Sequence, residues 1–465
     1  MSTSHSVQIR ETVTLVRFRF LVAMLLLLLL AACSATGNLV LGDPADGNIA
    51  SQDQPIFPDP ATPEPPPKVE STVRSLGDSP AAGTPTPGRA ALDRIVVASG
   101  RGQVYLIDPD GQRRLDMSGA GVGSQPVWSP DGRRIAWSQS GPSGWSINSA
   151  NTDGTELRQA TTLFSGYFGS WSPTSRRLGF LGNAPPGTGL VLDDGTGADL
   201  DSVVDSDTFY YFSWSPDGTR WVVHSGSGIS VVAIDGSRTL IDLEPARFRA
   251  PVWAEDGSIL LAVRHDDRNM IVQLDPASGD FDELLEVGDV TNFVLDPTGR
   301  YLAVESVVLG KGQEDLGSGI TVSTAMQPDE PNAVVLVYDM QTGAVRQILQ
   351  ERTGGFWWSP DGTTLAFLVQ EESATPEFLQ WLMWRAEETF RSERFRLSPT
   401  FGAAYVPFFD QFAQSVTPWS PDSTRFVYSA FDLAGDPGVF VQAARPDASA
   451  ERISDDVGIA FWSPT

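Results

Sequence analysis

Residues that could carry out acid–base or nucleophilic chemistry are scarce in this chain. Its 465 residues include three histidines and one cysteine. His224 lies in "WVVHSGS" and His265 in "VRHDDR", and either could in principle serve a Ser-His-Asp triad. His265 is followed by Asp266 and Asp267, a grouping that could bind a metal ion but is more often a solvated loop. Because the chain also contains no G-x-S-x-G segment, we expect no catalytic residue, no metal site and no cofactor.

The single cysteine has a context that indicates lipid attachment. Three arginines among the first 19 residues precede an uncharged run, Phe20–Ala32, and this order is typical of an export signal. The run ends in "LAAC" at 30–33, which resembles the bacterial lipobox. That resemblance implies that residues 1–32 are a lipoprotein signal peptide and that Cys33 is lipidated, with two acyl chains that suffice for stable anchoring. The alternatives are an ordinary secretory signal with an incidental cysteine and an uncleaved anchor helix.

Residues 33–92 have the composition of a disordered tether. Segments such as "DPATPEPPPKVE" are rich in Pro, Thr and Ala and have no hydrophobic period, so they cannot bury enough apolar surface to fold. We expect this tether to hold the folded part away from a membrane. The expected location is the outer face of the cell membrane, or the outer membrane if the cell has one. The net charge of −26 repels phosphate groups and argues against nucleic-acid binding.

The remainder of the chain repeats one five-residue phrase. "WSPDG" occurs at 128–132, 214–218 and 358–362, and alignment on it gives eight copies. The copies begin at Trp128, Trp171, Trp214, Trp253, Leu295, Trp358, Trp419 and Trp462. Their successive spacings are 43, 43, 39, 42, 63, 61 and 43 residues. A period near 40–45 residues is typical of four-stranded propeller blades, and the two long intervals indicate insertions of roughly 20 residues.

The composition of the phrase predicts a turn between two strands. Ser, Pro, Asp and Gly are each favoured at the position that they would occupy in a type I turn. A β-rich run follows the phrase, such as "RRIAW" after Trp128 and "TRFVY" after Trp419, and a second run ends in a turn cluster, as in "QVYLIDPDG". Each unit is therefore predicted to be antiparallel β-structure, with the tryptophan of the phrase buried between adjacent blades.

These repeats resemble the WD-like units of the TolB-type β-propeller family, over residues 94–465. The resemblance implies an all-β fold, and eight phrases predict a single propeller of eight four-stranded blades over 93–465. The run "RIVVAS" at 95–100 has no phrase before it, and the last phrase has no run after it. We therefore expect "GIAFWSPT" at 458–465 to pair with 95–100 and close the ring. The family's propellers serve periplasmic binding proteins, peptidase caps and lyases, so the fold alone does not fix the function.

The two long intervals are the least repeat-like parts of the predicted propeller. We place their insertions near residues 306–332 and 370–415, and the second is rich in aromatic residues. Its candidate partner-binding residues are Trp381, Trp384, Phe401, Tyr405, Phe408, Phe409 and Phe412. Exposed, these rings would form a patch resembling a binding hot spot, whereas rings that cap the edge of the propeller would belong to its core. Burial is favoured because "FLQWLMW" occupies the expected place of a blade strand.

Two functions from different classes fit these features. The first is a non-catalytic, membrane-anchored binding module that presents a propeller face to a protein, peptide or glycan. The second is a metal-assisted lyase or hydrolase acting on envelope or extracellular polymers, which would need His, Glu and Asp side chains that converge on the central channel. Two histidines within the predicted propeller are too few for a multi-histidine site, so the binding module is the favoured hypothesis.

Overall fold

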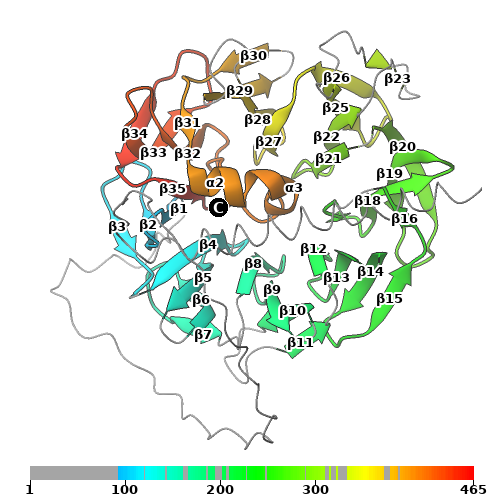
Figure 1. The fold of residues 1–465 in the computed structure, drawn as a ribbon, viewed down its shortest axis with the longest axis horizontal. Helices are drawn as coiled ribbons and strands as arrows, with labels where there is room; N and C mark the ends of the chain where they lie inside the picture. The colour runs from blue at the N-terminus through cyan, green and yellow to red at the C-terminus, as the bar shows by residue number, and fades with distance from the viewer. Residues whose placement is uncertain are drawn as a thin grey trace, which may run out of the picture. The chain divides into compact units, whose positions relative to one another are not determined.

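The computed structural model describes a ring of β-sheets around a central axis (Figure 1). It covers residues 93–465 except 120, 142–143, 161–165, 185–186, 194–201, 206–208, 227, 247–248, 289, 309–313, 316–320, 323–331, 371–377 and 386–387. The expected signal peptide and tether, residues 1–92, lie outside the described residues. The ring contains eight blades, so the predicted all-β propeller and its blade count are confirmed. Among the described residues, no helix is long and apolar enough to cross a membrane.

Each of the first four blades has four antiparallel strands that follow one another from the centre of the ring outward. Blade one contains β35 (Gly458–Trp462), β1 (Ile95–Ser99), β2 (Val104–Ile107) and β3 (Arg114–Asp116). Blade two contains β4 (Val122–Trp128), β5 (Arg134–Gly141), β6 (Gly144–Asn151) and β7 (Arg158–Ala160). Blade three contains β8 (Gly166–Trp171), β9 (Leu178–Ala184), β10 (Gly187–Asp193) and β11 (Ser202–Asp205). Blade four contains β12 (Phe209–Trp214), β13 (Arg220–Ser225), β14 (Gly228–Ala233) and β15 (Arg238–Ile241).

The other four blades carry the departures from this pattern. Blade five contains the short strands β16 (Glu244–Pro245) and β17 (Val252–Trp253), then β18 (Ile259–His265), β19 (Arg268–Leu274) and β20 (Phe281–Val287). Blade six contains β21 (Val290–Leu295), β22 (Tyr301–Val308), β25 (Asn332–Asp339) and β26 (Val345–Leu349), with the added pair β23 (Glu314–Asp315) and β24 (Thr321–Val322). Blade seven contains β27 (Thr353–Trp358), β28 (Thr364–Gln370), β29 (Leu379–Arg385) and β30 (Glu388–Arg391). Blade eight contains β31 (Arg396–Leu397), β32 (Arg425–Phe431), β33 (Pro437–Ala443) and β34 (Ala450–Ser454).

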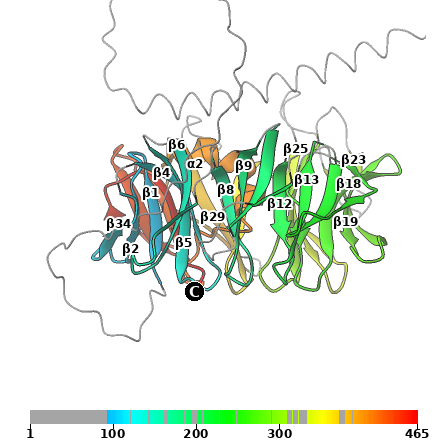
Figure 2. The ribbon, with the colours of Figure 1, turned by 90° about the horizontal axis from the view of Figure 1, so that it is seen from below.

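The two ends of the repeat region close the ring within blade one, as predicted. β35 pairs antiparallel with β1, in a register that runs from Ile95 opposite Trp462 to Ser99 opposite Gly458. Asp93 fastens the junction, because Trp462 Nε1 donates to its Oδ1 at 2.7 Å and Arg425 Nη2 donates to its Oδ2 at 3.0 Å. Seen edge-on, the strands run between the two faces of the disc, and the C-terminus lies at one of them (Figure 2). Closure removes the unpaired innermost edge that β1 would otherwise expose.

Each Ser-Pro-Asp-Gly phrase forms the predicted turn between the first and second strands of a blade. In blade four, Gly218 N donates to Ser215 O at 2.8 Å, and Gly218 has a φ of +66°, which favours glycine. The buried Ser215 hydroxyl accepts from Arg220 N at 2.9 Å and donates to Asp217 Oδ1 at 2.6 Å. This bond from Ser215 lowers the pKa of Asp217 despite some burial, with further bonds from Thr219. The phrase therefore encodes a hydrogen-bonded corner.

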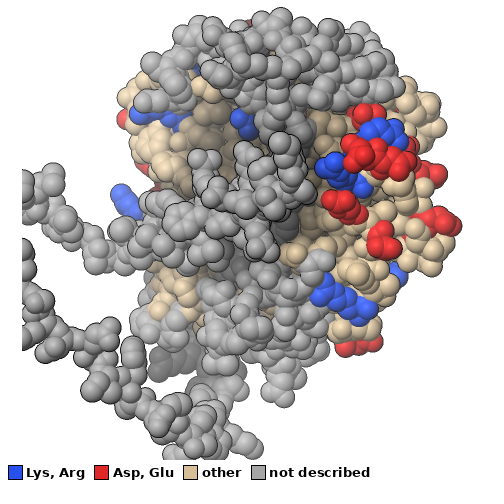
Figure 3. Space-filling view, turned by 45° about the vertical axis from the view of Figure 1, so that its right-hand side comes forward, with Lys and Arg blue, Asp and Glu red and all other residues tan. Residues whose placement is uncertain are grey.

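The outer two strands of blade five carry partly exposed ion pairs. In blade five, Arg268 Nη2 lies 3.2 Å from Glu283 Oε2, and Arg268 Nη1 lies 3.6 Å from Glu286 Oε2. Acidic and basic side chains are interspersed on this side of the molecule (Figure 3). Such pairs are partly exposed, so each contributes about 1 kcal/mol or less to stability. The charge pattern indicates a solvated outer edge.

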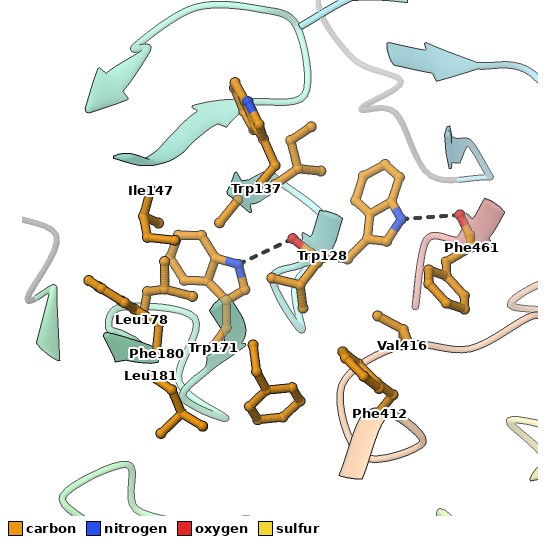
Figure 4. Close-up of a cluster of buried hydrophobic side chains, with 14 of the residues drawn as sticks. Trp128, Trp137, Ile147, Trp171, Leu178, Phe180, Leu181, Phe412, Val416 and Phe461 are labelled. Atoms are coloured by element: carbon orange, nitrogen blue, oxygen red, sulfur yellow. Dashed lines mark hydrogen bonds between the residues drawn. The ribbon is translucent and has the colours of Figure 1, made fainter. Parts of the chain in front are cut away.

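The tryptophans of the phrase pack between adjacent blades, which confirms their predicted position. Trp171 Nε1 donates to Val127 O and Trp128 Nε1 donates to Phe461 O, each at 3.4 Å (Figure 4). The same bond to the preceding blade recurs from Trp214 to Ser170, from Trp358 to Val294 and from Trp419 to Trp357. Each of these five indoles therefore buries its ring against the blade core while the innermost strand of the preceding blade satisfies its one polar atom, whereas Trp253 Nε1 donates to Gly257 O in its own blade.

An arginine six residues after the tryptophan of the phrase adds a second link between blades. The guanidinium of Arg134 lies 5.3 Å from the ring centroid of Trp171 in the next blade. Equivalent stacking places Arg220 over Trp253 at 5.0 Å and Arg425 over Trp462 at 4.9 Å. A cation over an indole face is attractive, by about 0.5–2 kcal/mol depending on exposure. The recurring arginine is thus part of the repeat, although our sequence analysis did not single it out.

Candidate functional site

The insertion between Trp358 and Trp419 forms a helical segment at the centre of the ring. It consists of α2 (Pro399–Ala404), the 3-10 turn η1 (Val406–Phe408) and α3 (Phe409–Phe412), and we call residues 399–412 the central plug. Figure 1 shows α2 and α3 inside the circle of innermost strands. The plug interrupts the innermost strand of blade eight, where β31 pairs with β32 at one end and Trp419 bridges Phe426 at the other.

The position of this insertion refines the expected one. We predicted inserted residues near 370–415, in the blade that follows Trp358. That blade, blade seven, keeps four strands, and "FLQWLMW" forms most of its β29, as its pattern suggested. The extra residues lie in the next blade, just before its phrase. Of the first predicted insertion, 306–332, only the short β23 and β24 pair and the flanking strand ends belong to the described residues.

The start of the central plug follows from its local sequence. Ser398 caps α2, because its Oγ accepts from Phe401 N at 3.4 Å, and Pro399 occupies the first helical turn, where a missing N–H is tolerated. Ser398 Oγ also donates to Gly458 O in β35. Tyr405 N donates to Phe401 O at 3.0 Å and ends the helix. One serine therefore both begins the plug and attaches it to the strand that closes the ring.

Aromatic rings of the central plug contact the innermost strands of several blades. The ring of Phe412 lies 5.0 Å from Phe168 in blade three, in an edge-to-face arrangement. Tyr405 lies 5.2 Å from Phe461 in blade one, and Phe409 lies 4.8 Å from Phe356 in blade seven. Offset and edge-to-face pairs at these distances stabilise by about 0.5–1.5 kcal/mol each beyond their buried area. The plug therefore ties blades together across the ring.

Gln411 of the plug and Gln414, two residues after its end, both bond to backbone atoms of the ring. Gln411 Nε2 donates to Phe212 O and Gln411 Oε1 accepts from Phe212 N, both at 2.9 Å. Its amide thus takes the place of a strand neighbour for β12, and the side chain is only 2% exposed. Gln414 Nε2 donates to Pro251 O at 3.0 Å in blade five. These contacts had no sequence signal, because a glutamine after an aromatic run has no distinguishing pattern.

A buried carboxyl group lies where the plug meets the 249–251 segment, which connects β16 and β17 in blade five. Asp410 Oδ2 accepts from Ala250 N at 3.1 Å, and Oδ1 accepts from Gln411 N at 3.1 Å. Burial raises the pKa of Asp410, and the nearby positive charge of Arg249 opposes this shift. The pKa of Tyr211 in β12 is also raised, by its own burial and then by the charge of Asp410. Asp410 and Tyr211 therefore both lie in surroundings that disfavour their charged forms.

His224 lies behind this segment and is not available as a nucleophile's base. It is buried, and its Nδ1 lies 2.8 Å from the backbone oxygen of Arg249. Burial lowers the pKa of His224, which keeps the imidazole neutral near pH 7, although the bond to Arg249 opposes the shift. The imidazole therefore fixes the backbone of the 249–251 segment from the blade side, opposite the contact made by Asp410.

The seven candidate partner-binding residues separate into two places and two exposure classes. Trp381 and Trp384 belong to β29 in blade seven, and the other five belong to the central plug. Four side chains are buried, namely Trp381, Tyr405, Phe409 and Phe412. Three are half-buried, namely Trp384, Phe401 and Phe408. The seven therefore do not form one continuous exposed patch, because most of their rings fill the centre of the ring and the core of blade seven.

His265 lies in a surface ion-pair cluster. Its Nε2 is 3.7 Å from Asp266 Oδ2 and 3.7 Å from Glu283 Oε1, and its ring packs edge-on against Phe281. Within the described part of the chain, no group of three or more His, Cys, Asp or Glu side chains is arranged to hold a metal ion. Cys33, the predicted lipidation site, lies outside the described residues.

No protein-family model and no curated protein matches this sequence. Solved structures with a related fold include TolB from Acinetobacter baumannii, at 14% identity over 63% of this chain and 76% of that chain, with a TM-score of 0.37. Oligogalacturonate lyase from Vibrio parahaemolyticus has 13% identity over 76% and 98% of the two chains, with a TM-score of 0.47. Dihydro-heme d1 dehydrogenase NirN in complex with DHE has 15% identity over 81% and 77%, with a TM-score of 0.50. At this identity, the likeness to NirN supports the propeller fold alone.

Proposed function

We propose that this chain is a non-catalytic, lipid-anchored extracytoplasmic protein that binds a protein, peptide or glycan through the exposed side of its central plug. The observation that carries the proposal is the uncharged character of that side. Pro399, Thr400, Ala403 and Pro407 are exposed, and Phe401 and Phe408 beside them are half-buried. The chain as a whole carries a net charge of −26. An uncharged, partly aromatic area on an acidic protein has the composition of the core of a binding interface.

The rigidity of the central plug supports this proposal. Its buried face is fixed by the rings of Tyr405, Phe409 and Phe412 and by the two hydrogen bonds of Gln411. A preformed surface binds a partner without the entropy loss of ordering a loop. The carboxyl group of Asp410 has a structural role, because both of its oxygens accept hydrogen bonds from backbone N–H groups. The arrangement therefore fits recognition better than acid–base catalysis.

Replacing Phe408 with alanine should weaken capture of the partner by about tenfold or more, because truncating a hot-spot residue of a binding interface costs about 2 kcal/mol or more. The ring of Phe408 lies 6.5 Å from Tyr211, and its partial exposure leaves part of it for a partner. The measurement is affinity capture with crosslinking on intact cells that express the full chain. Leu433→Ala is the matched control, since Leu433 is an exposed apolar residue outside the plug. Equal losses from both variants would contradict the assignment of the plug as the contact surface.

Replacing Cys33 with serine should abolish lipid labelling and leave the chain in its precursor form, because a hydroxyl group cannot replace the thiol that accepts the diacylglycerol. The expectation rests on the "LAAC" junction at residues 30–33. Incorporation of a labelled fatty acid, followed by electrophoresis, measures both effects. Unchanged labelling of the serine variant would rule out the lipoprotein assignment without affecting the assignment of the plug.

A further inference from the structure

The contact between α3 and the 249–251 segment contains a carboxyl group that has no ion-pair partner among the described residues. Asp410 is 2% exposed, and both of its oxygens accept from uncharged backbone N–H groups, of Ala250 and Gln411. Among the described residues, no Lys, Arg or His nitrogen lies within 4.0 Å of this carboxyl group. Burying a carboxylate without a paired cation is unfavourable, whereas burying a neutral carboxylic acid with its hydrogen bonds made is much less so.

The elements packed around α3 supply little compensating charge. β21, β27 and η1 contain no ionisable side chain, and β8 contains Tyr167, whose side chain is outside the described set. β12 contributes Tyr211, whose phenol stays neutral, and the 249–251 segment contributes the half-buried Arg249. Behind Arg249 lies the buried His224. Arg249 is thus the one described cation facing Asp410, and its charge opposes the effect of burial on the pKa of Asp410 without cancelling it.

We propose that Asp410 makes the seating of the central plug depend on pH, with α3 held most firmly against the 249–251 segment while Asp410 is protonated. As the pH rises, the carboxyl group releases its proton to solvent and a carboxylate is left in a mostly apolar site. Hydrating that carboxylate requires α3 to move away from Ala250, which breaks the 3.1 Å hydrogen bond between them. The plug is therefore a proton-sensitive latch at the centre of the ring, independently of what binds its outer side.

The direction of the effect follows from linkage. Because burial raises the pKa of Asp410 in the folded protein, its stabilising contribution is complete below the ordinary pKa of an aspartate and is lost as the pH rises through the raised value. His224 acts in the opposite direction, since its lowered pKa gives a contribution that is present above about pH 6.5 and is lost as the pH falls. A comparison of two proteins that share His224 cancels its effect and isolates that of Asp410.

Hydrogen exchange of the amides in 409–416, measured on the full chain from about pH 4.5 to 9 and corrected for intrinsic exchange, tests the latch. For the wild type, protection relative to Asp410→Asn, which has no proton to lose, should fall by up to about tenfold per pH unit between the ordinary pKa of an aspartate and the raised value, and should level off above it. Asp267→Asn, at an exposed carboxylate, is the control and should follow the wild type. A ratio of wild type to Asp410→Asn that stays constant with pH would overturn the proposal.

A second measurement on the wild type alone covers the case in which Asp410→Asn does not fold. With aspartate carboxyl carbons labelled with ¹³C, one resonance should titrate at a pH well above the others, and the loss of protection in 409–416 should level off at the pH of that step. Absence of a high-pH carboxyl step, or a step with no accompanying change in protection, would show that Asp410 does not control the plug.

Discussion

Without residues 457–465, the propeller should no longer show the cooperative melting transition that the full chain shows at its own melting temperature. The deletion removes β35, so β1 loses its five-residue register and becomes an exposed innermost edge. It also removes Phe461 and Trp462, which are 1% and 0% exposed. Loss of a buried Phe or Trp side chain costs about 3–5 kcal/mol each, and together these approach the typical net stability of a folded domain, about 5–15 kcal/mol.

Differential scanning calorimetry of the full and the shortened chain measures this effect. The matched control is Phe461→Ala, which keeps the backbone of β35 and its pairing with β1, so its loss should be clearly smaller than that of the deletion. Since Phe461 also contacts Tyr405, the control measures the loss of a contact with the plug while the ring stays closed. A shortened chain that melts cooperatively at the wild-type temperature would contradict closure through β35.

Replacing Phe409 with alanine should destabilise the propeller by about 3–5 kcal/mol, the range for truncating a buried phenylalanine. The ring is 4% exposed and lies 4.8 Å from Phe356 and 5.9 Å from Trp357 in blade seven. Truncation leaves a cavity between the plug and β27, and the short helix α3 cannot collapse to fill it while Gln411 remains bonded to Phe212.

Phe408→Ala is the control for this prediction, because Phe408 is adjacent to Phe409 in the chain but its own ring is only half-buried. The midpoint of urea unfolding should fall much further for Phe409→Ala than for Phe408→Ala. Conversely, Phe408→Ala should weaken partner capture by about tenfold or more while its unfolding midpoint stays close to that of the wild type. Similar midpoints for both variants would show that the plug is not part of the core.

The repeat phrase predicted most of the fold because it carries both the turn and the packing. The turn chemistry of Ser215, Asp217 and Gly218 and the burial of Trp214 follow from residue types at fixed spacing. The pairing of 95–100 with the C-terminal run followed from an unmatched strand at each end. Even the stacking arginines had a signal, since Arg220 follows its phrase at the same distance as Arg134 and Arg425.

The central plug could not be predicted, because the spacing of the repeat phrase gives the number of inserted residues but not their position in the fold. An interval of 61 residues between Trp358 and Trp419 is equally consistent with a long outer loop and with a segment inside the ring. The choice depends on contacts with distant strands, such as Gln411 with Phe212 and Phe412 with Phe168. No local pattern encodes such contacts, and the same aromatic residues would suit an exposed patch.

The central claim is that the partner contacts the exposed side of the plug. Site-specific photo-crosslinking in intact cells tests this claim most directly. A photoreactive residue is placed at Ala403, which is exposed on α2, or at Leu433, an exposed residue of blade eight that does not belong to the plug. We expect a single discrete adduct from position 403 and none from position 433, with the adduct at 403 lost when Phe408→Ala is added. Adducts of equal yield from both positions, or from position 433 alone, would contradict the account.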